Sequence, residues 1–451
     1  MLFVFYAEVY YRYFEKRAFK GEKSMNYIFD YIMIPLQLII VFFTLYYFII
    51  AFFGIWRKTE KKIMTPKNSF AVIVAAHNEE QVIGQLVENL HVLKYPKELY
   101  DIFVVADNCK DNTADIARGA GAIVYERFSL EQRGKGYAME WMFAKLFKLE
   151  RNYDSVVIFD ADNLVEQNFL LEMNNRLCKG EKVIQGYLDS KNPHDTWIAG
   201  TFAISFWVVN HIWHLAKYNI GLSSVLGGTG MCISTDVLRK FGWGATCLTE
   251  DMEFTMKVLL KGIPTTWAHD AIVYDEKPLT FKQSWRQRKR WAQGHFDIAG
   301  RYIPSMLYEG IRQRDIRILD GVLHLFQPYF LILSTSFVLM SYIYTIVPFY
   351  TNIINKILPV EVMTAIGIGQ YLFPVMILAM IGAKGKSWWY LIFYPLFVYS
   401  WIPITILGFL HRNDREWSHT EHTRSISYKD VLLTQKSEFG KEEFLGKQAV
   451  K

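Results

Sequence analysis

Residues 155–163 read SVVIFDADN, an apolar run that ends in two aspartates one residue apart. Runs of the same kind occur elsewhere along the chain: FAVIVAA (70–76), IFVVA (102–106), AIVY (122–125) and KVIQGYL (182–188). Short, nearly continuous apolar runs are typical of strands buried on both faces. Between them, apolar residues recur at helical spacing over 82–90 and 169–177. This alternation predicts an α/β domain built around a buried parallel sheet.

Acidic residues follow two of these predicted strands. Asp107 comes after 102–106, and Asp160 and Asp162 come after 155–159. Ligands of such sheets bind at the carboxyl ends of the strands. Two carboxylates one residue apart can meet one divalent ion, and Mg²⁺ or Mn²⁺ commonly shares hard oxygen ligands with substrate phosphates. The alternative is a loop with two solvated acids, in which Asn163 favours a turn.

The loops after the first two strands also admit structural explanations. His77, Asn78 and Glu79 follow the strand at 70–76, where Asn78 is a candidate helix N-cap. Asp107 begins an Asp/Asn-rich turn, and Asp111 is a candidate cap for a helix that begins at Asn112. A binding role for Asp107 and a capping role for Asp111 are compatible.

Two glycine-containing stretches favour close approach of a ligand. Arg133-Gly-Lys135-Gly begins a predicted helix, and Lys135 can reach a phosphate from there. Gly227, Gly228 and Thr229 lie in a bend that leads into MCIST, where small residues leave room for a sugar. A solvated turn for the first stretch and a structural turn for the second remain alternatives.

Thr249-Glu250-Asp251 precedes the amphipathic sequence DMEFTMKVLLKG. A carboxylate here can act as a general base if burial or neighbouring acids raise its pKa. Thr249 as an N-cap with acids in the first helical turn explains the same residues structurally.

Gln287-Arg-Lys-Arg290-Trp291 lies in a basic, aromatic helical segment, FKQSWRQRKRWAQGHF. Arg290 can pair with a diphosphate through bidentate hydrogen bonds, and Trp291 offers an apolar face for a sugar. A basic amphipathic helix that rests on lipid headgroups is the structural alternative, and both descriptions can hold together.

Taken in order, Asp107, Asp160-x-Asp162, Thr-Glu-Asp and Gln-x-x-Arg-Trp resemble the motifs of membrane-bound inverting glycosyltransferases of family 2, the cellulose, hyaluronan and chitin synthase type. The resemblance covers about residues 70–295. It implies a GT-A fold, a UDP-sugar donor, a Mg²⁺ or Mn²⁺ cofactor and inversion at the anomeric carbon. Many relatives carry two adjacent acids where this chain has Ala106-Asp107.

The resemblance also implies a role for each motif. Asp251 would be the catalytic base, and Asp160 and Asp162 would hold the metal and the diphosphate. The remaining residues would bind substrate: His77, Glu79, Asp107 and Lys135 at the nucleotide sugar; Gly228, Thr229, Thr249 and Glu250 around the transfer site; Gln287, Arg290 and Trp291 at the acceptor and leaving group. His77 takes a position where relatives usually have an aromatic residue.

The composition indicates a membrane protein with a soluble domain. Apolar residues make up 51% of the 451 residues, whereas charged residues still make up 21%. The net charge is +6, and basic residues stand beside apolar stretches, which fits an anionic membrane surface better than nucleic acid.

The predicted order begins with an aromatic interfacial helix (1–28), a transmembrane helix (29–55) and the GT-A domain (56–280). Amphipathic interfacial helices (281–318), about three spans (319–410) and a soluble tail (411–451) follow. The span candidates in the last region are 322–348, 362–383 and 387–410. Arg57, Lys58, Lys61 and Lys62 follow the first span, so the domain is expected to be cytosolic. Three later spans would place the tail outside, whereas its Arg412 and Arg415 favour the cytosol.

The expected function is therefore extension of a β-linked polysaccharide from a UDP-sugar at the cytosolic face of the plasma membrane, with translocation through the chain's own helices. The alternative acceptor is a membrane lipid, as in ceramide or diacylglycerol glucosyltransferases. A binding-only subunit is disfavoured because Asp251 and Arg290 are both present. Accessory subunits or a homo-oligomer are compatible partners, and no nucleic-acid partner is expected.

Overall fold

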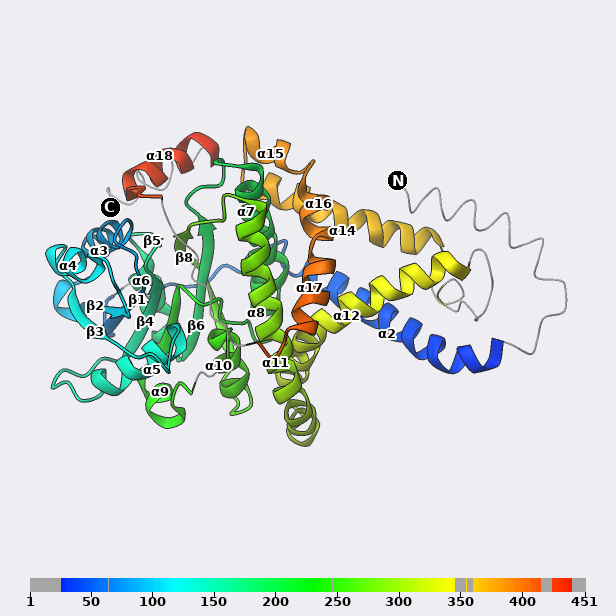
Figure 1. Ribbon diagram of the computed structural model, residues 1–451, viewed down its shortest axis with the longest axis horizontal. Helices are drawn as coiled ribbons and strands as arrows, with labels where there is room; N and C mark the ends of the chain where they lie inside the picture. The colour runs from blue at the N-terminus through cyan, green and yellow to red at the C-terminus, as the bar shows by residue number, and fades with distance from the viewer. Residues whose placement is uncertain are drawn as a thin grey trace.

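The computed structural model describes residues 26–63, 65–244, 247–344, 354, 360–414 and 424–439. The interfacial helix predicted over 1–28 lies almost entirely outside these residues, as do two parts of the predicted tail. Figure 1 shows a sheet flanked by helices, with three long helices projecting from one side of it.

An eight-stranded sheet forms the centre of the α/β domain, in the order β3-β2-β1-β4-β7-β6-β8-β5. The strands run in parallel except β7, which is antiparallel to β4 and β6, and β5, which is antiparallel to β8. The predicted all-parallel sheet is thus mixed at these two strands. Their bounds are β1 (Phe70–Ala76), β2 (Tyr100–Asp107), β3 (Ile123–Arg127), β4 (Ser155–Asp160), β5 (Leu164–Val165), β6 (Val183–Ser190), β7 (Met231–Ser234) and β8 (Thr265–Asp275).

Helices cover both faces of the sheet because successive residues of each strand point to opposite faces. Phe70, Val72 and Val74 of β1 pack with one group of helices, and Ala71 and Ile73 pack with the other. The helices predicted from periodicity over 82–90 and 169–177 lie in the first group. That group is α3 (Ile83–His91), α4 (Thr113–Gly119) and α6 (Phe169–Cys178); the second is α5 (Lys135–Leu146), α9 (Thr235–Phe241) and α10 (Glu250–Leu259); η1 (Lys97–Leu99) leads into β2.

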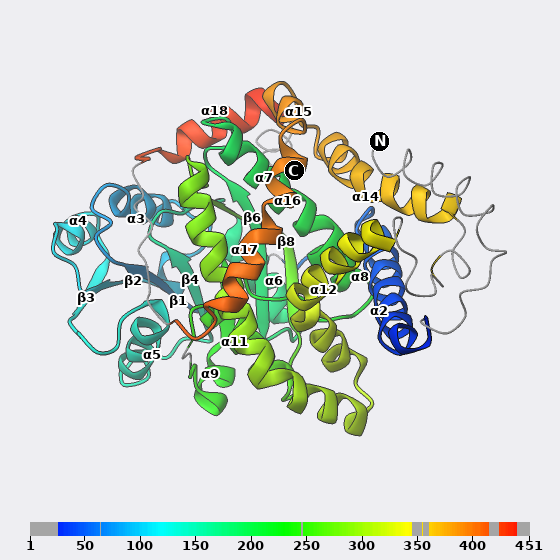
Figure 2. The same cartoon turned by 45° about the vertical axis from the view of Figure 1, so that its right-hand side comes forward.

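A second layer of helices joins the sheet to the projecting helices. In Figure 2, α17 lies along α11, and the two contact each other closely. Gly408 permits this approach, since a Cβ there would stand 2.5 Å from the Ala292 Cβ. The layer comprises α7 (Trp197–Val209), the π-helical turn η2 (Asn210–Leu215), α8 (Ala216–Asn219), α11 (Phe281–Gln313) and α17 (Trp401–Leu410).

The projecting helices are α2 (Asn26–Phe52), α12 (Ile316–Tyr344) and α14 (Val360–Met380), which lie together in both views (Figures 1 and 2). Among the described residues, two helical stretches are long and apolar enough to cross a membrane by length and composition, Tyr31–Phe52 and Ile316–Ile343. They correspond to the span predicted over 29–55 and to the one predicted over 322–348.

The span predicted over 387–410 is not one continuous helix. The chain forms α15 (Lys386–Tyr390), α16 (Tyr394–Tyr399) and α17 instead. Pro395 lies in the first turn of α16, a position where proline starts a helix rather than continuing one. The sequence predicted that Pro395 and Pro403 would kink this span, and the chain breaks before Pro395, whereas Pro403 lies within α17.

Part of the predicted tail returns to the sheet. Helix α18 (Tyr428–Phe439) places Val431, which is buried, against Leu164 and Tyr274 of β5 and β8. The Tyr428 hydroxyl donates to Glu166 Oε1 at 2.9 Å. This segment therefore packs against the edge strand of the sheet, as the red helix in Figure 1 shows.

Candidate active site

The ends of β1 and β2 bring Asp107 next to His77. Asp107 Oδ1 accepts a hydrogen bond from Arg127 Nη1 at 2.6 Å, and both side chains are buried. His77 Nδ1 lies 2.6 Å from the Asp107 carbonyl oxygen. Burial raises the pKa of the Asp107 carboxyl above its usual value, and the Arg127 guanidinium partly offsets that rise. Arg127, which ends β3 opposite Asp107, was not singled out from the sequence.

Asn78 and Asn108 shape the loops at this corner. Both adopt positive φ, 55° and 53° respectively, a conformation that asparagine tolerates better than most residues. Asn78 Oδ1 accepts from the Lys110 amide, and Asn108 Oδ1 from the Ser129 amide, each at 2.8 Å. Asn78 does not cap a helix, because α3 begins at Ile83 with Val82 as its N-cap.

Glu79, in the loop after β1, and Asp111, in the loop after β2, both bond to Thr113 at the start of α4. Glu79 is buried, and its amide donates to Thr113 Oγ1 at 2.8 Å. Asp111 Oδ1 accepts from the Thr113 amide at 3.1 Å, at the start of α4. Asp111 therefore stabilises the helix start as predicted, with Asn112 in the N-cap position itself.

Lys135 links Asp160 to the glycine-rich bend. Its ammonium pairs with Asp160 Oδ1 and donates to the Gly228 carbonyl oxygen at 2.6 Å. Thr229 Oγ1 accepts from the Asp160 amide at 3.1 Å and also contacts Asn163 Oδ1. The predicted donor-side residues Lys135, Asp160, Gly228 and Thr229 are thus one connected cluster at the end of β4.

Asp162 lies deeper than Asp160. It is buried, and its Oδ2 accepts from the Glu276 amide at 2.9 Å. Asp275, at the end of β8, adds a carboxylate nearby: burial, then the charges of Asp162 and Asp160, raise its pKa to about 6 against the opposing effect of Lys277. Lys277 Nζ lies 2.6 Å from Asp275 Oδ1. Asp275 and Lys277 were not predicted as site residues, because the apolar pattern of the sequence does not reveal β8.

Asp251 stands at the start of α10, facing the bend. A Cβ on Gly228 would lie 3.4 Å from Asp251 Oδ2. Burial, reinforced by the charge of Glu250, raises the pKa of the Asp251 carboxyl to about 7. The pKa of Glu250 is also raised by burial, while the charges of Lys135 and Arg290 oppose that rise.

Lys135 is the cation between these acids. Burial alone would lower the pKa of its ammonium, but the charges of Asp160, Glu250 and Asp251 outweigh this effect and raise the pKa above its usual value. The amino group therefore stays protonated, and it ties the acid at β4 to the acids at α10.

Thr249 is the N-cap residue of α10, but its side chain makes no capping hydrogen bond. It packs instead against α11: a Cβ on Gly294 would overlap the Thr249 side chain. The alternative prediction that the Thr249 side chain caps the helix is therefore wrong. Thr249 is a packing contact between the acidic loop and α11.

Helix α11 presents the Gln287–Trp291 segment to the rest of the protein. Thr280 and Gln283 form a capping box at its start. Arg290 Nη1 reaches the Leu248 carbonyl oxygen at 3.5 Å, and the Trp291 ring packs on Phe202 and Phe206 of α7.

The neighbouring side chains of α11 face inward as well. Arg288 is fully buried and donates to Ser400 Oγ at 2.8 Å and to the Phe397 carbonyl oxygen at 3.2 Å. Gln287 Oε1 is buried and accepts no hydrogen bond from the described residues. This stretch of α11 is thus packed between α7 and α17, and is not a helix lying free on a surface.

The predicted site residues therefore fall into adjoining groups. His77, Glu79 and Asp107 lie at the ends of β1 and β2. The cluster at β4 and α10 is next to them, since β1 pairs with both β2 and β4. Arg290 interacts with this cluster in two ways: its charge lowers the pKa of Glu250, and its guanidinium donates to the Leu248 carbonyl oxygen. The members of the middle cluster are Lys135, Asp160, Gly228, Thr229, Glu250 and Asp251.

The acidic end of β4 fits a hard divalent cation in its chemistry. Asp160 and Asp162 offer carboxylate oxygens, and the Asp160 side chain is 41% exposed. No group of three or more His, Cys, Asp or Glu side chains suited to a metal occurs within the described part of the chain. Mg²⁺ is often held by one or two carboxylates together with substrate phosphates, so two aspartates are a sufficient protein contribution.

Comparison with known proteins agrees with this architecture. The family model "Glycosyltransferase like family 2" matches residues 66–294. The mannosyltransferase PcManGT from Pyrobaculum calidifontis, solved with GDP-Man and Mn²⁺, has a similar fold, with a TM-score of 0.56 and 16% identity over 84% of this chain and 97% of that one. The fold and this match define the class as GT-A glycosyltransferases. The chain belongs to glycosyltransferase family 2, and it is an enzyme of that class.

Its curated relatives differ in what their names describe. The chain is 26% identical to "Probable glycosyltransferase YdaM" of Bacillus subtilis, over 81% of this chain and 89% of that protein. It is 27% identical to the "Beta-monoglucosyldiacylglycerol synthase" of Nostoc, over 53% of this chain and 52% of that protein. It is 23% identical to the "Poly-beta-1,6-N-acetyl-D-glucosamine synthase" of Staphylococcus aureus, over 50% of this chain and 54% of that protein. The chain thus spans about half the length of the two relatives whose names state a product.

Proposed function

We propose that this protein is a membrane-bound inverting glycosyltransferase that extends a β-linked polysaccharide from a UDP-activated hexose or N-acetylhexosamine. The α/β domain works at the cytosolic face of the cell membrane, to which α2 and α12 anchor it. The observation that carries the proposal is the position of Asp251, whose half-buried carboxyl group has its pKa raised to about 7 and lies beside Gly228 and near Lys135.

Asp251 is the proposed general base. In one displacement, the acceptor hydroxyl gives its proton to the Asp251 carboxylate while its oxygen bonds to the anomeric carbon. The bond from that carbon to the diphosphate oxygen breaks, and UDP leaves on the opposite face, which inverts the configuration. A base with a pKa near neutrality combines adequate basicity with a deprotonated form at physiological pH.

The donor is held by residues on both sides of Lys135. Asp107, with His77 and Glu79, faces the nucleoside, and Lys135 contacts the diphosphate from the start of α5. Asp160 and Asp162 would hold Mg²⁺ or Mn²⁺, which when bound neutralises charge on the diphosphate leaving group. Arg290 adds a fixed positive charge near the α10 acids, as its effect on Glu250 indicates.

The acceptor would lie at α11, where Gln287 offers a buried oxygen with no partner among the described residues and Trp291 offers an aromatic face. Gly228 and Thr229, with Thr249 and Glu250, bound the position where acceptor and donor meet. Helix α11 packs against α12 and α17, so a growing chain would pass close to these helices.

A single transfer to a membrane lipid is the second candidate. It is favoured by the 27% identity to the protein named "Beta-monoglucosyldiacylglycerol synthase", which exceeds the 23% identity to the one named "Poly-beta-1,6-N-acetyl-D-glucosamine synthase". Both candidates use the same base and donor site and differ in the acceptor.

Transfer assays separate the two candidates. Membranes containing the protein are incubated with labelled UDP-glucose or UDP-N-acetylglucosamine and Mn²⁺, and with EDTA as the metal-free control. Label in a high-mass product supports the polysaccharide synthase. Label confined to organic-soluble lipid supports the second candidate and contradicts the first. An absence of transfer with retained UDP binding contradicts both.

A further inference from the structure

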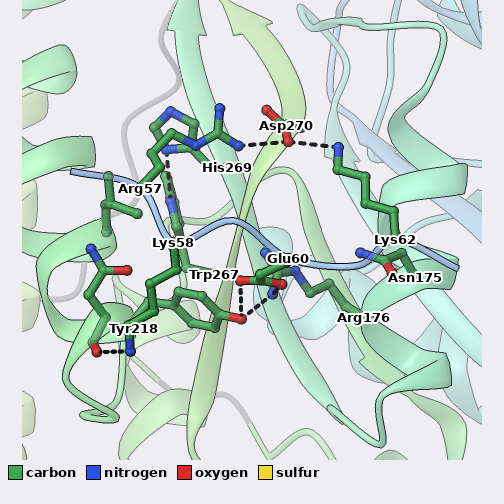
Figure 3. A pocket seen from close by; sticks show the side chains of 12 residues that line it. Arg57, Lys58, Glu60, Lys62, Asn175, Arg176, Tyr218, Trp267, His269 and Asp270 are labelled. Atoms are coloured by element: carbon green, nitrogen blue, oxygen red, sulfur yellow. Dashed lines mark hydrogen bonds and ion pairs between the residues drawn. The ribbon is translucent and has the colours of Figure 1, made fainter.

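A polar pocket lies where α2 passes into the α/β domain (Figure 3). Its walls come from the linker 57–62, from α6, from η2 and α8, and from the first half of β8. The pocket has a cavity volume of about 50 Å³ and is partly open to solvent. None of its lining residues belongs to the site proposed for glycosyl transfer.

Positive charge predominates in the lining, which holds four basic and two acidic side chains: Arg57, Lys58, Lys62 and Arg176, with Glu60 and Asp270. Arg57 and Lys62 share one carboxylate, since both contact Asp270 Oδ2, at 2.7 and 2.8 Å. Lys62 also meets Glu172, behind the pocket, at 2.6 Å. Lys62 thus has two carboxylate partners, and Arg57 shares one of them.

Lys58 has a weaker partner than the other cations. Its ammonium donates to the Asn219 carbonyl oxygen at 2.5 Å, and no carboxylate among the described residues pairs with it. In Figure 3, Lys58 lies on the linker side of the pocket, opposite Arg176.

Two buried polar atoms in the lining have no hydrogen-bond partner among the described residues: Arg176 Nε and Asn219 Oδ1. Arg176 is 8% exposed and Asn219 is 6% exposed. Arg176 Nη1 is held by Glu60 at 3.0 Å, by Glu181 at 3.4 Å and by Tyr218. Buried polar groups are normally satisfied, so a donor and an acceptor left open in one pocket point to a ligand.

The pocket lies at the expected level of lipid headgroups. It begins one residue after Trp56, which is 51% exposed, and α2 ends at Phe52. Asn219 Nδ2 donates to the carbonyl oxygens of Phe53 and Trp56, at 2.7 and 2.8 Å, and so fixes the end of α2 against the pocket wall. Tryptophan and basic residues at the end of a span are typical of the cytosolic membrane interface.

We propose that this pocket binds an anionic phosphate group, supplied by a phospholipid headgroup or by free phosphate. Lys58, Arg57 and Arg176 Nε donate to the phosphate oxygens, and Asn219 Oδ1 accepts from a hydroxyl of the headgroup. Basic pockets on the cytosolic side of membrane helices bind acidic lipids in this way.

The test uses the full-length chain in a neutral detergent and follows its thermal unfolding with three additives: phosphatidylglycerol, phosphatidylcholine and inorganic phosphate. Phosphatidylglycerol is expected to raise the unfolding temperature, whereas phosphatidylcholine, which carries no net charge, leaves it unchanged. Lys58→Gln is expected to raise the half-effective phosphatidylglycerol concentration roughly fivefold, as for one lost cationic contact at a membrane surface. Lys58→Arg retains the wild-type response.

Lys61→Gln is the matched control, because Lys61 is an exposed lysine of the same linker outside the pocket lining. If inorganic phosphate reproduces the Lys58-dependent effect, the source is free phosphate; if phosphatidylglycerol alone does so, it is the lipid. Equal responses of wild type and Lys58→Gln, equal stabilisation by the two lipids, or no stabilisation by any additive would overturn the proposal. If Lys58→Gln does not fold, Arg57→Gln takes its place, since the Arg57 side chain is half exposed.

Discussion

Thr249 lies directly against Gly294, so closely that a Cβ on Gly294 would overlap the Thr249 side chain. The contact joins the loop before Asp251 to the helix that carries Arg290. Because Thr249 immediately precedes Glu250 and Asp251, a displacement at this contact moves the proposed base relative to α11. The contact therefore sets the distance between the two halves of the proposed transfer site.

Gly294→Ala is expected to lower kcat by roughly 10²-fold, the loss that a misplacement of about 1 Å can cause. The protein should remain folded, since the change adds one methyl group. Steady-state transfer assays and thermal unfolding check this together. Gly300→Ala is the control, because it lies in the same helix with open space around its Cβ position; a loss of activity as large as that of Gly294→Ala would count against the account.

Lys135→Gln is expected to weaken UDP-sugar use, because the amide cannot pair with Asp160 as the ammonium does. The loss of a charge-assisted contact corresponds to roughly 10- to 100-fold in kcat/KM. Lys148→Gln, an exposed lysine just beyond α5, should leave kcat/KM unchanged. Similar values for the two variants would remove Lys135 from the donor site.

Substitutions of Arg290 and Arg288, two residues apart, are expected to affect different properties: transfer activity for Arg290 and thermal stability for Arg288. Arg290→Ala should abolish transfer with little change in unfolding temperature, since its hydrogen bond to Leu248 is 3.5 Å long. Arg288→Ala should lower the unfolding temperature, since that fully buried side chain bonds to Phe397 in α16 and to Ser400 between α16 and α17. Circular dichroism melts beside transfer assays distinguish the two, and a reversed pattern would refute the assignment of Arg290.

Arg127→Leu removes the partner of the buried Asp107 and leaves that carboxylate uncompensated. The expected destabilisation is about 3–5 kcal/mol. Arg118→Leu, which breaks exposed pairs with Asp115 and Glu126, should cost far less, since solvent screens exposed pairs. Denaturant unfolding measures both, and equal losses would show that the Asp107–Arg127 pair is not structurally important.

Stability should also depend on pH through Asp251. Burial raises the pKa of its carboxyl in the folded protein to about 7 from an ordinary value of 3.8, so the folded state favours the protonated form. The contribution of the Asp251 carboxyl to the free energy of unfolding is fully present below about pH 4. It is lost as the pH rises through about 7. Asp251→Asn cannot ionise, so its unfolding temperature relative to wild type should be higher at pH 8 than at pH 5. A difference that does not change with pH would contradict the raised pKa.

The sequence predicted the parts of the fold that local pattern determines. The strand at 70–76 was found because its residues are apolar throughout and its bounds are set by polar neighbours. Strand β8 was missed because His269 and Asp270 interrupt its apolar pattern. In the structure these residues lie at a shift in the β6–β8 register, and Asp270 pairs with the linker residue Arg57. The break of 387–410 into three helices depends on packing against α11 and α7, which hydropathy cannot register.

In the candidate site too, some residues could be predicted from local pattern and others could not. Asp107, Asp160 and Asp251 could be proposed from motif order, since each stands at the end of a recognisable strand or the start of a helix. Arg127 and Asp275 could not, because their importance arises from strand neighbours distant in sequence: β3 pairs with β2, and β8 with β6. Predicting strand order would have brought Arg127 opposite Asp107.

The most direct test of the central claim is the turnover rate of Asp251→Asn, measured with its affinity for UDP. We expect transfer to fall by about 10²- to 10⁴-fold, the usual contribution of a general base, while UDP affinity stays within about threefold of wild type. In the wild type, kcat should rise with pH through about 7 as Asp251 loses its proton. Full turnover in Asp251→Asn would contradict the assignment of Asp251 as the base.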